Sequence, residues 1–242
     1  MIDALDYMLL KGCGTADDES MAFHRVVGDL KSRVICFLPW GATIPAAQRL
    51  NMIPATFLAC YELPLAIVSS EPQLCADATR MLVVDALALI DQTDFKSETI
   101  VMLGLSMGSG PATVLANATG GRLCSVTSAD RGDLMLWQSR AAVGVKKKAM
   151  HKGYCLPDFS QALQGLHSIE NLHYIRQDSI FITSERDLFV PAVRSAALIQ
   201  AVRDARPDAQ LITSSRGHVR TLCAAVLHLP ELLEKQGRSA AA

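Results

Sequence analysis

The stretch that decides the fold is residues 100–110, which read Ile-Val-Met-Leu-Gly-Leu-Ser-Met-Gly-Ser-Gly and place Ser106 in a G-x-S-x-G pattern. A strand-like apolar run leads into this pattern, and a helix-like segment at 111–118 follows it. A sharp turn between a strand and a helix lifts a serine hydroxyl out of the sheet, and glycines on either side remove Cβ atoms that would collide there. The pattern therefore predicts a nucleophilic hydroxyl at Ser106. It also predicts that the Met107 N–H, at the positive start of a helix, can donate to a developing oxyanion.

The competing interpretation of this stretch is a Gly/Ser-rich turn that approaches a phosphate. The lysine of a phosphate-binding P-loop is missing, and the G-x-G-x-x-G spacing of dinucleotide-binding turns does not match. We therefore favour the nucleophile.

Around this stretch, short apolar runs alternate with segments of helical spacing. Such runs are typical of strands buried on both faces of a parallel sheet, and the alternation predicts an α/β fold with a mostly parallel central sheet flanked by helices. The runs lie at 33–38, 65–69, 99–105, 123–128, 179–183 and 210–213. Helical faces are formed by Leu74, Ala78, Met81, Leu82 and Leu89, and by Leu198, Ala201, Val202 and Ala205. Further strands are expected around 7–10 and 22–27. Residues 131–178 break the rhythm and are expected to form a small helical cap inserted over one edge of the sheet.

Length and composition are those of one globular domain spanning 1–242. Half of the residues are apolar, 19% are charged, and the net charge is −1. This balance gives no bulk attraction to nucleic acid or to an acidic membrane. The seven cysteines never form a C-x-x-C pair, so neither a metal site nor any cofactor is expected. The acidic N-terminus does not resemble a secretory signal, and no apolar run has the length of a membrane span, so the cytoplasm is the expected location.

A serine nucleophile needs a general base and a group that orients the base, and two later strand ends offer them. One predicted strand runs into a polar loop that contains Asp187, and the next runs into Gly217 and His218. Both residues lie just beyond the carboxyl end of a strand, the edge where open α/β sheets bind ligands. Glu185, Asp130 and Asp133 are alternatives for the acid. The remaining histidines are interpreted as solvated or capped surface residues: His24, His151, His167, His173 and His228.

A second oxyanion donor is expected in the loop after the strand at 33–38, which continues Pro39-Trp40-Gly41-Ala42-Thr43. The donor is predicted to be the backbone N–H of Ala42 or of Trp40, with Ala42 slightly favoured. The Trp40 side chain is then expected to form a wall of the substrate pocket, although a plain core position is equally compatible with the sequence.

These features together resemble the α/β-hydrolase superfamily. The resemblance rests on Gly104-Leu105-Ser106-Met107-Gly108, on Asp187 before Val190-Pro191, and on Gly217-His218, and it extends from Arg33 onward. It implies a serine hydrolase related to esterases and thioesterases. Acyltransferases and non-catalytic receptors with this fold are known as well. The chain departs from the family at Pro39-Trp40, where many members carry His-Gly.

The expected substrate is a small-molecule acyl ester or thioester, cleaved through an acyl-enzyme on Ser106. Trp137 in the cap is expected to contribute, with Leu134, Leu136 and Met150, to an apolar acyl pocket, although a plain cap core fits these residues equally well. Arg140 and Lys146–Lys148 would attract an anionic substrate or simply form a solvated helix face. Acyl transfer to an alcohol or amine uses the same residues. A ligand-binding protein without turnover would not require Ser106, Asp187 and His218 together.

Overall fold

The computed structural model describes residues 19–232, which form a seven-stranded sheet in the order β1-β3-β2-β4-β5-β6-β7. The edge strand β1 is antiparallel to β3, and the other neighbouring strands are parallel. Every residue of the central strands β4 and β5 is buried, as expected of a sheet covered on both faces. The strands are β1 (Arg25–Val27), β2 (Val34–Phe37), β3 (Ala59–Tyr61), β4 (Val101–Leu105), β5 (Arg122–Val126), β6 (Ile180–Arg186) and β7 (Gln210–Gly217).

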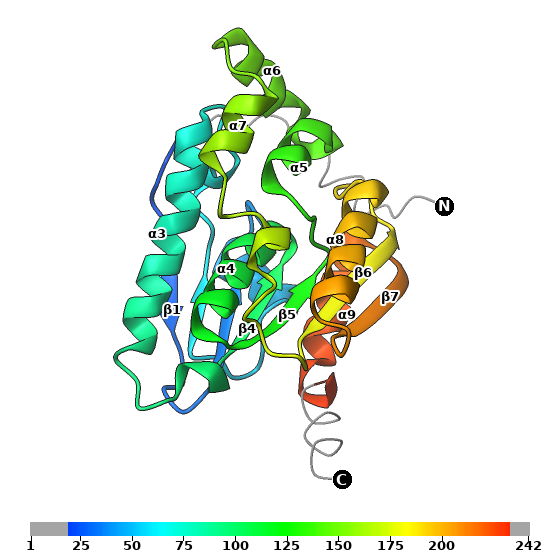
Figure 1. Cartoon of the computed structure of the whole chain (residues 1–242). Helices are drawn as coiled ribbons and strands as arrows, with labels where there is room; N and C mark the ends of the chain where they lie inside the picture. Colours follow the sequence, from blue (N-terminus) through cyan, green and yellow to red (C-terminus); the bar gives the residue numbers. More distant parts are fainter. Residues whose placement is uncertain (1–18, 233–242) are drawn as a thin grey trace.

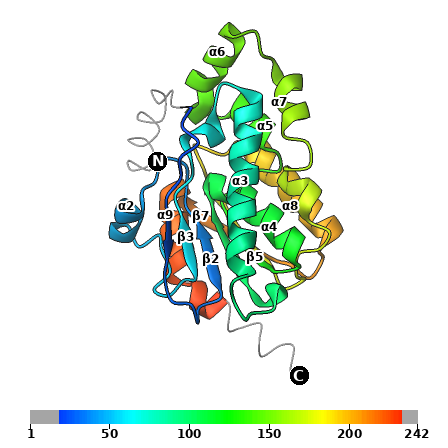
Figure 2. The same cartoon turned by 90° about the vertical axis from the view of Figure 1, so that its left-hand side faces the viewer.

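Helices cover both faces of this sheet, giving three layers (Figures 1 and 2). Successive residues of β2 point to opposite faces of the sheet, so both faces are apolar and need to be covered. Ile35 and Phe37 belong to the core on the α3 and α4 side, whereas Cys36 belongs to the core beneath α2 and α9. Leu198 and Val202 of α8 join the first of these cores, as their helical spacing predicts. The flanking helices are α2 (Ile44–Arg49), α3 (Pro72–Ile90), α4 (Ser109–Thr119), α8 (Ala192–Ala205) and α9 (His218–Leu227).

The segment between β5 and β6 is helical, as the sequence predicts. It contains α5 (Gly132–Gln138), α6 (Val143–His151) and α7 (Leu156–Ala162), which stand at the top of Figure 1. Phe159 of α7 is 1% exposed and packs into the core that α3 and α4 share. The segment is therefore attached to the main body by apolar packing.

The predicted strand at 65–69 is wrong. These residues begin with the 3₁₀ turn η1 (Leu65–Val68), in which the Ile67 N–H donates to the Pro64 carbonyl oxygen (3.1 Å). The strand beside β2 is β3 instead, which pairs Cys60 with Cys36. A short apolar run fits a buried turn as well as a strand, and the three residues of β3 are too few for a clear pattern. The expected strand around 7–10 lies outside the described residues.

Candidate active site

Ser106 lies at the junction of β4 and the helical turn η3 (Ser106–Gly108), which continues into α4. Its φ of +54° is left-handed, a conformation that costs a non-glycine residue on the order of 1–3 kcal/mol. The flanking glycines make this turn possible. A Cβ at residue 104 would overlap the Ser109 Cα, and a Cβ at residue 108 would overlap the carbonyl oxygens of Phe37 and Leu38. The two glycines thus allow α4 to fold back closely against β4 and β2.

Asp187 and His218 are brought together by the pairing of β6 with β7. Arg186 and Gly217 are partners at the end of this ribbon, and Asp187 and His218 are the residues that directly follow the two strands. Asp187 Oδ2 lies 2.7 Å from His218 Nδ1, and His218 Nε2 lies 3.0 Å from Ser106 Oγ. A continuous hydrogen-bonded chain therefore joins the carboxylate, the imidazole and the hydroxyl.

The carboxylate of Asp187 is itself held in place. Its Oδ1 accepts hydrogen bonds from the N–H groups of Phe189 (2.8 Å) and Val190 (2.9 Å), which leaves Oδ2 for the imidazole. The Phe189 ring packs against the His218 ring at a centroid distance of 4.7 Å. Because an ionised carboxylate only accepts, it selects the tautomer of His218 with the proton on Nδ1. The lone pair of Nε2 then faces Ser106, where it can take the hydroxyl proton.

The three alternative acids lie elsewhere. Asp130 forms an ion pair with Arg194 (3.1 Å), and Asp133 is held by Arg131 and Ser160. Glu185 is exposed. The structure thus places Asp187, and none of these three, in hydrogen-bond contact with His218.

The backbone around Ser106 offers two N–H groups for an oxyanion. The Met107 N–H begins the turn that leads into α4, and Trp40 lies in the loop after β2. Neither N–H is hydrogen-bonded to another residue within 19–232. The Ala42 N–H, by contrast, donates to the Pro39 carbonyl oxygen (3.1 Å) and closes a turn. This geometry favours Trp40 over Ala42 as the second donor.

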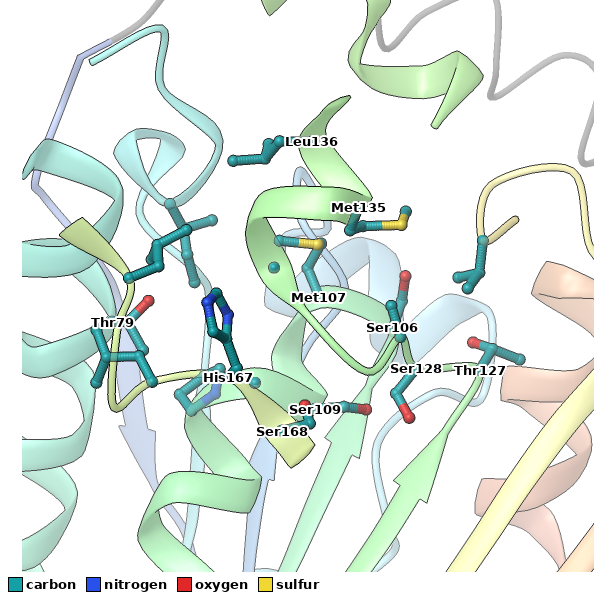
Figure 3. A pocket seen from close by; sticks show the side chains of 18 residues that line it. Thr79, Ser106, Met107, Ser109, Thr127, Ser128, Met135, Leu136, His167 and Ser168 are labelled. Carbon is teal, nitrogen blue, oxygen red and sulfur yellow. The ribbon is translucent and has the colours of Figure 1, made fainter. Parts of the chain in front are cut away.

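Two pockets meet at Ser106 and Met107. The first, here called the Trp40 pocket, has a volume of about 210 Å³, includes His218 and is otherwise mainly apolar. Its apolar lining includes Trp40, Ala46, Leu50, Met52, Phe189 and Leu222. The second, here called the His167 pocket, has a volume of about 60 Å³ and is shown in Figure 3. Its polar lining beyond Ser106 comes from Thr79, Ser109, Thr127, Ser128, His167 and Ser168.

Trp137, expected to line a substrate pocket, is not among the residues that line either of these two pockets. Its ring packs against Phe159 at a centroid distance of 5.3 Å, and the Lys146 ammonium lies 5.5 Å from the ring centroid. From the same helix, Met135 lines both pockets and Leu136 lines the His167 pocket. The helical spacing of α5 therefore directs Met135 and Leu136 to the site and Trp137 towards α7.

The interpretation of His167 as a surface residue is wrong. Its side chain is 3% exposed and lines the pocket that begins at Ser106, whereas the other four histidines outside the hydrogen-bonded chain are exposed. A single histidine in a polar segment carries no sequence signal of burial. Only the packing of this segment against α4 and α3 encloses His167.

Two kinds of feature were not found among residues 19–232: a cluster of metal-ligating side chains and a membrane-spanning helix. Residues 19–232 contain no group of three or more His, Cys, Asp or Glu side chains that could hold a metal ion. No helix in the same range combines the length and apolar character needed to cross a bilayer.

No model of a known protein family matches the chain, and no curated protein does. Solved structures with a similar fold include an esterase from Pyrococcus furiosus (14% identity, TM-score 0.57, covering 88% of this chain and 92% of that one). A lipase-esterase related protein from Clostridium acetobutylicum is similar as well (14% identity, TM-score 0.52, covering 88% of this chain and 98% of that one).

The chain is also similar to the acylaminoacyl peptidase of Pyrococcus horikoshii (12% identity, TM-score 0.55). The similar region covers 89% of this chain but only 39% of the length of the peptidase. At such identities the likeness concerns the fold. The mostly parallel seven-stranded sheet, the helices on both faces and the serine turn after β4 agree with it. The protein has the α/β-hydrolase fold.

Proposed function

We propose that the protein is a serine hydrolase that cleaves a carboxylic ester or thioester through an acyl-enzyme on Ser106. The observation that supports this proposal is the hydrogen-bonded chain from Asp187 through His218 to Ser106, with distances of 2.7 and 3.0 Å. A serine hydroxyl is a weak nucleophile, and an oriented imidazole is what activates it. The names of the structural neighbours, which include esterases and a peptidase, agree with a hydrolase.

In the proposed reaction, Ser106 Oγ attacks the acyl carbon while His218 Nε2 takes the hydroxyl proton. The N–H groups of Met107 and Trp40 stabilise the tetrahedral oxyanion. The bond to the leaving group then breaks, and His218 gives its proton to the departing oxygen or sulfur. Water, deprotonated by the same imidazole, attacks the acyl-enzyme. The bond between the acyl carbon and Ser106 Oγ then breaks, His218 returns the proton to Oγ, and the acid is released. Asp187 holds the imidazole and stabilises its protonated form throughout.

We also propose that residues 131–178 act as a cap over this site within a single domain. Met135 lines both pockets, Leu136 lines the His167 pocket, and Ala141 lines the Trp40 pocket. In addition, the Ser139 hydroxyl donates to the Phe189 carbonyl oxygen (2.6 Å), next to the loop that carries Asp187. The cap would therefore shape the substrate pockets and support the acid loop.

The decisive experiment treats the protein with a fluorophosphonate probe and measures turnover of p-nitrophenyl esters and acyl-thioesters. We expect a mass increase on Ser106 and measurable turnover. Ser106→Ala should remove the label and lower kcat by several orders of magnitude, because only binding and oxyanion contributions remain. Thermal unfolding checks that the variant is folded. Turnover within about tenfold of wild type in a folded Ser106→Ala protein contradicts the mechanism.

Two alternatives give different results in the same experiment. An acyltransferase would label at Ser106 and form a new ester or amide when an alcohol or amine is added. A binding protein without turnover would bind the ester and release it unchanged.

A further inference from the structure

The position of His218 distinguishes the two pockets that meet at Ser106, if the proposed function holds. The imidazole that takes the Ser106 proton must later give it to the leaving group, so the leaving group has to lie against His218. His218 lines the Trp40 pocket but is not among the residues that line the His167 pocket. The leaving group therefore belongs in the Trp40 pocket, and the acyl group belongs in the His167 pocket.

The acyl side of the site contains a buried imidazole without a hydrogen-bond partner. Neither ring nitrogen of His167 is hydrogen-bonded to a described residue, and the side chain is 3% exposed. At the start of η5 (Ser168–Asn171), the Glu170 N–H donates to the His167 carbonyl oxygen (3.1 Å). Figure 3 shows the imidazole on one side of the pocket and Ser106 on the other.

The nearest carboxylate does not satisfy this imidazole. Asp133 Oδ1 lies 3.8 Å from His167 Nε2, beyond hydrogen-bond distance. Asp133 already accepts hydrogen bonds from the Arg131 guanidinium, the Ser160 hydroxyl and the Leu134 N–H. Its acceptor capacity is therefore used by groups other than His167.

A second polar group in the same pocket also lacks a partner. The Thr127 hydroxyl is buried and forms no hydrogen bond within the described part of the chain. Thr127 follows β5, whereas His167 comes from the end of the cap segment, so the two reach the pocket from separate elements. Leaving a buried polar group unsatisfied costs about 1–3 kcal/mol, so these two groups beside Ser106 are available to hydrogen-bond a ligand in the pocket.

The protonation state of His167 narrows the chemistry of that ligand. Burial lowers the pKa of His167, although Asp133 and Glu170 act in the opposite direction. A neutral imidazole offers one donor and one acceptor, which matches a hydroxyl or carbonyl oxygen better than a cation. Apolar walls formed by Leu136, Leu163 and Leu166 can contact the methylene groups between this oxygen and the scissile carbonyl.

We propose that the substrate carries a short acyl group with a hydroxyl or keto oxygen, which hydrogen-bonds His167, and a larger apolar leaving group in the Trp40 pocket. This inference rests on the proposed hydrolase activity. It makes His167 a residue that determines acyl specificity.

The test compares p-nitrophenyl butyrate with its 2-hydroxy, 3-hydroxy and 3-oxo derivatives, which share one leaving group. Each kcat/KM is divided by the uncatalysed alkaline hydrolysis rate of the same ester, because the added oxygen also activates the carbonyl group. We expect the corrected wild-type value to be about tenfold or more higher for at least one oxygenated ester than for the plain ester, which corresponds to about 1.4 kcal/mol. His167→Leu should reduce this ratio to about one by slowing the oxygenated ester. His167→Gln, which keeps a donor and an acceptor, should retain part of it.

His173→Leu is the matched control, because it makes the same change at an exposed histidine nearby and should leave the ratio unaltered. Equal corrected values for all four esters in the wild type, or an unchanged ratio in His167→Leu, overturn the inference while turnover still supports the proposed function. Absence of turnover of every ester together with no label on Ser106 overturns both. If His167→Leu shows no thermal unfolding transition, the variant is not folded and its rates are not interpreted. The kcat/KM ratios of the wild type and of His167→Gln then decide whether His167 determines acyl specificity.

Discussion

At the scale of single residues, the proposed chemistry depends on how each polar atom is already occupied. Asp187 uses one oxygen for two backbone N–H groups and the other for His218, so the carboxylate cannot turn away from the imidazole. The imidazole in turn has one nitrogen for Asp187 and the other for Ser106. Each group is therefore oriented before a substrate binds, which is the condition for an efficient proton transfer.

Asp187→Asn tests this arrangement directly. The amide keeps the shape but loses the charge, and it can hold the imidazole in the wrong tautomer. We expect kcat to fall by about 10⁴ with a small change in thermal stability. Steady-state kinetics with a p-nitrophenyl ester measures the effect. Asp130→Asn and Glu185→Gln are the controls and should cost far less. A larger loss in Asp130→Asn than in Asp187→Asn would contradict the assignment.

At the scale of elements, two local features position the site: the β6–β7 ribbon and the turn after β4. The β6–β7 ribbon continues past the last pairing of β6 with β5, with an irregularity in register between Ser184 and Arg186. Its end sets Asp187 beside His218. The turn after β4 sets Ser106 in front of the imidazole, and close packing of α4 against β2 keeps it there.

Gly108→Ala should disrupt the turn after β4 that positions Ser106. The added Cβ overlaps the carbonyl oxygens of Phe37 and Leu38, which are backbone atoms and cannot rotate away. Overpacking of this kind costs about 1–3 kcal/mol. In a domain of this size, 1 kcal/mol lowers Tm by about 2–4 °C. We expect a lower Tm together with a large loss of ester turnover, measured by thermal unfolding and kinetics.

Gly110→Ala is the matched control two residues further along. A Cβ at residue 110 meets no atom within 4 Å, and residue 110 lies inside α4, where alanine is favoured over glycine. This variant should be as stable as the wild type or slightly more so. Equal Tm losses in the two variants would show that the turn does not require glycine at residue 108.

At the scale of the whole molecule, a buried ion pair ties the loop after β5 to α8. Asp130 and Arg194 have side chains that are 5% and 15% exposed, with a distance of 3.1 Å between Oδ2 and Nη1. Burial raises the pKa of Asp130, and Arg194 acts in the opposite direction. The pair joins the segment that leads into α5 to the helix that follows Asp187.

Arg194→Met should leave the Asp130 carboxylate buried without its partner and cost about 3–5 kcal/mol at pH 7. Without Arg194, the pKa of Asp130 rises further. An acid whose pKa is higher in the folded state binds more protons when folded, so stability is regained as the pH falls. Thermal unfolding should therefore show a larger Tm loss at pH 7 than at pH 5.

The double variant Asp130→Asn/Arg194→Met removes the buried charge and is the control for this pH dependence. Its Tm loss should be smaller than that of Arg194→Met and should differ less between the two pH values. A Tm loss in Arg194→Met that is equal at pH 5 and pH 7 would show that the Asp130 charge does not cause the destabilisation.

The sequence by itself determined the layered α/β class, five of the six apolar runs as strands of the sheet, the helices α3, α4 and α8, and the turn at Ser106. These features follow from local rules, because helical spacing, buried apolar runs and glycines at a tight turn act over a few residues. Asp187 and His218 could be named for the same reason, since each directly follows a strand.

Only the tertiary structure decided which groups meet in space. The register of β6 against β7 puts Asp187 beside His218, the turn at Pro39–Ala42 occupies the Ala42 N–H, and the packing of residues 131–178 buries His167. The three-residue strand β3 forms because β1 and β2 pair with it. Each of these outcomes depends on contacts between residues far apart in the chain, and such contacts leave no periodic pattern in the sequence.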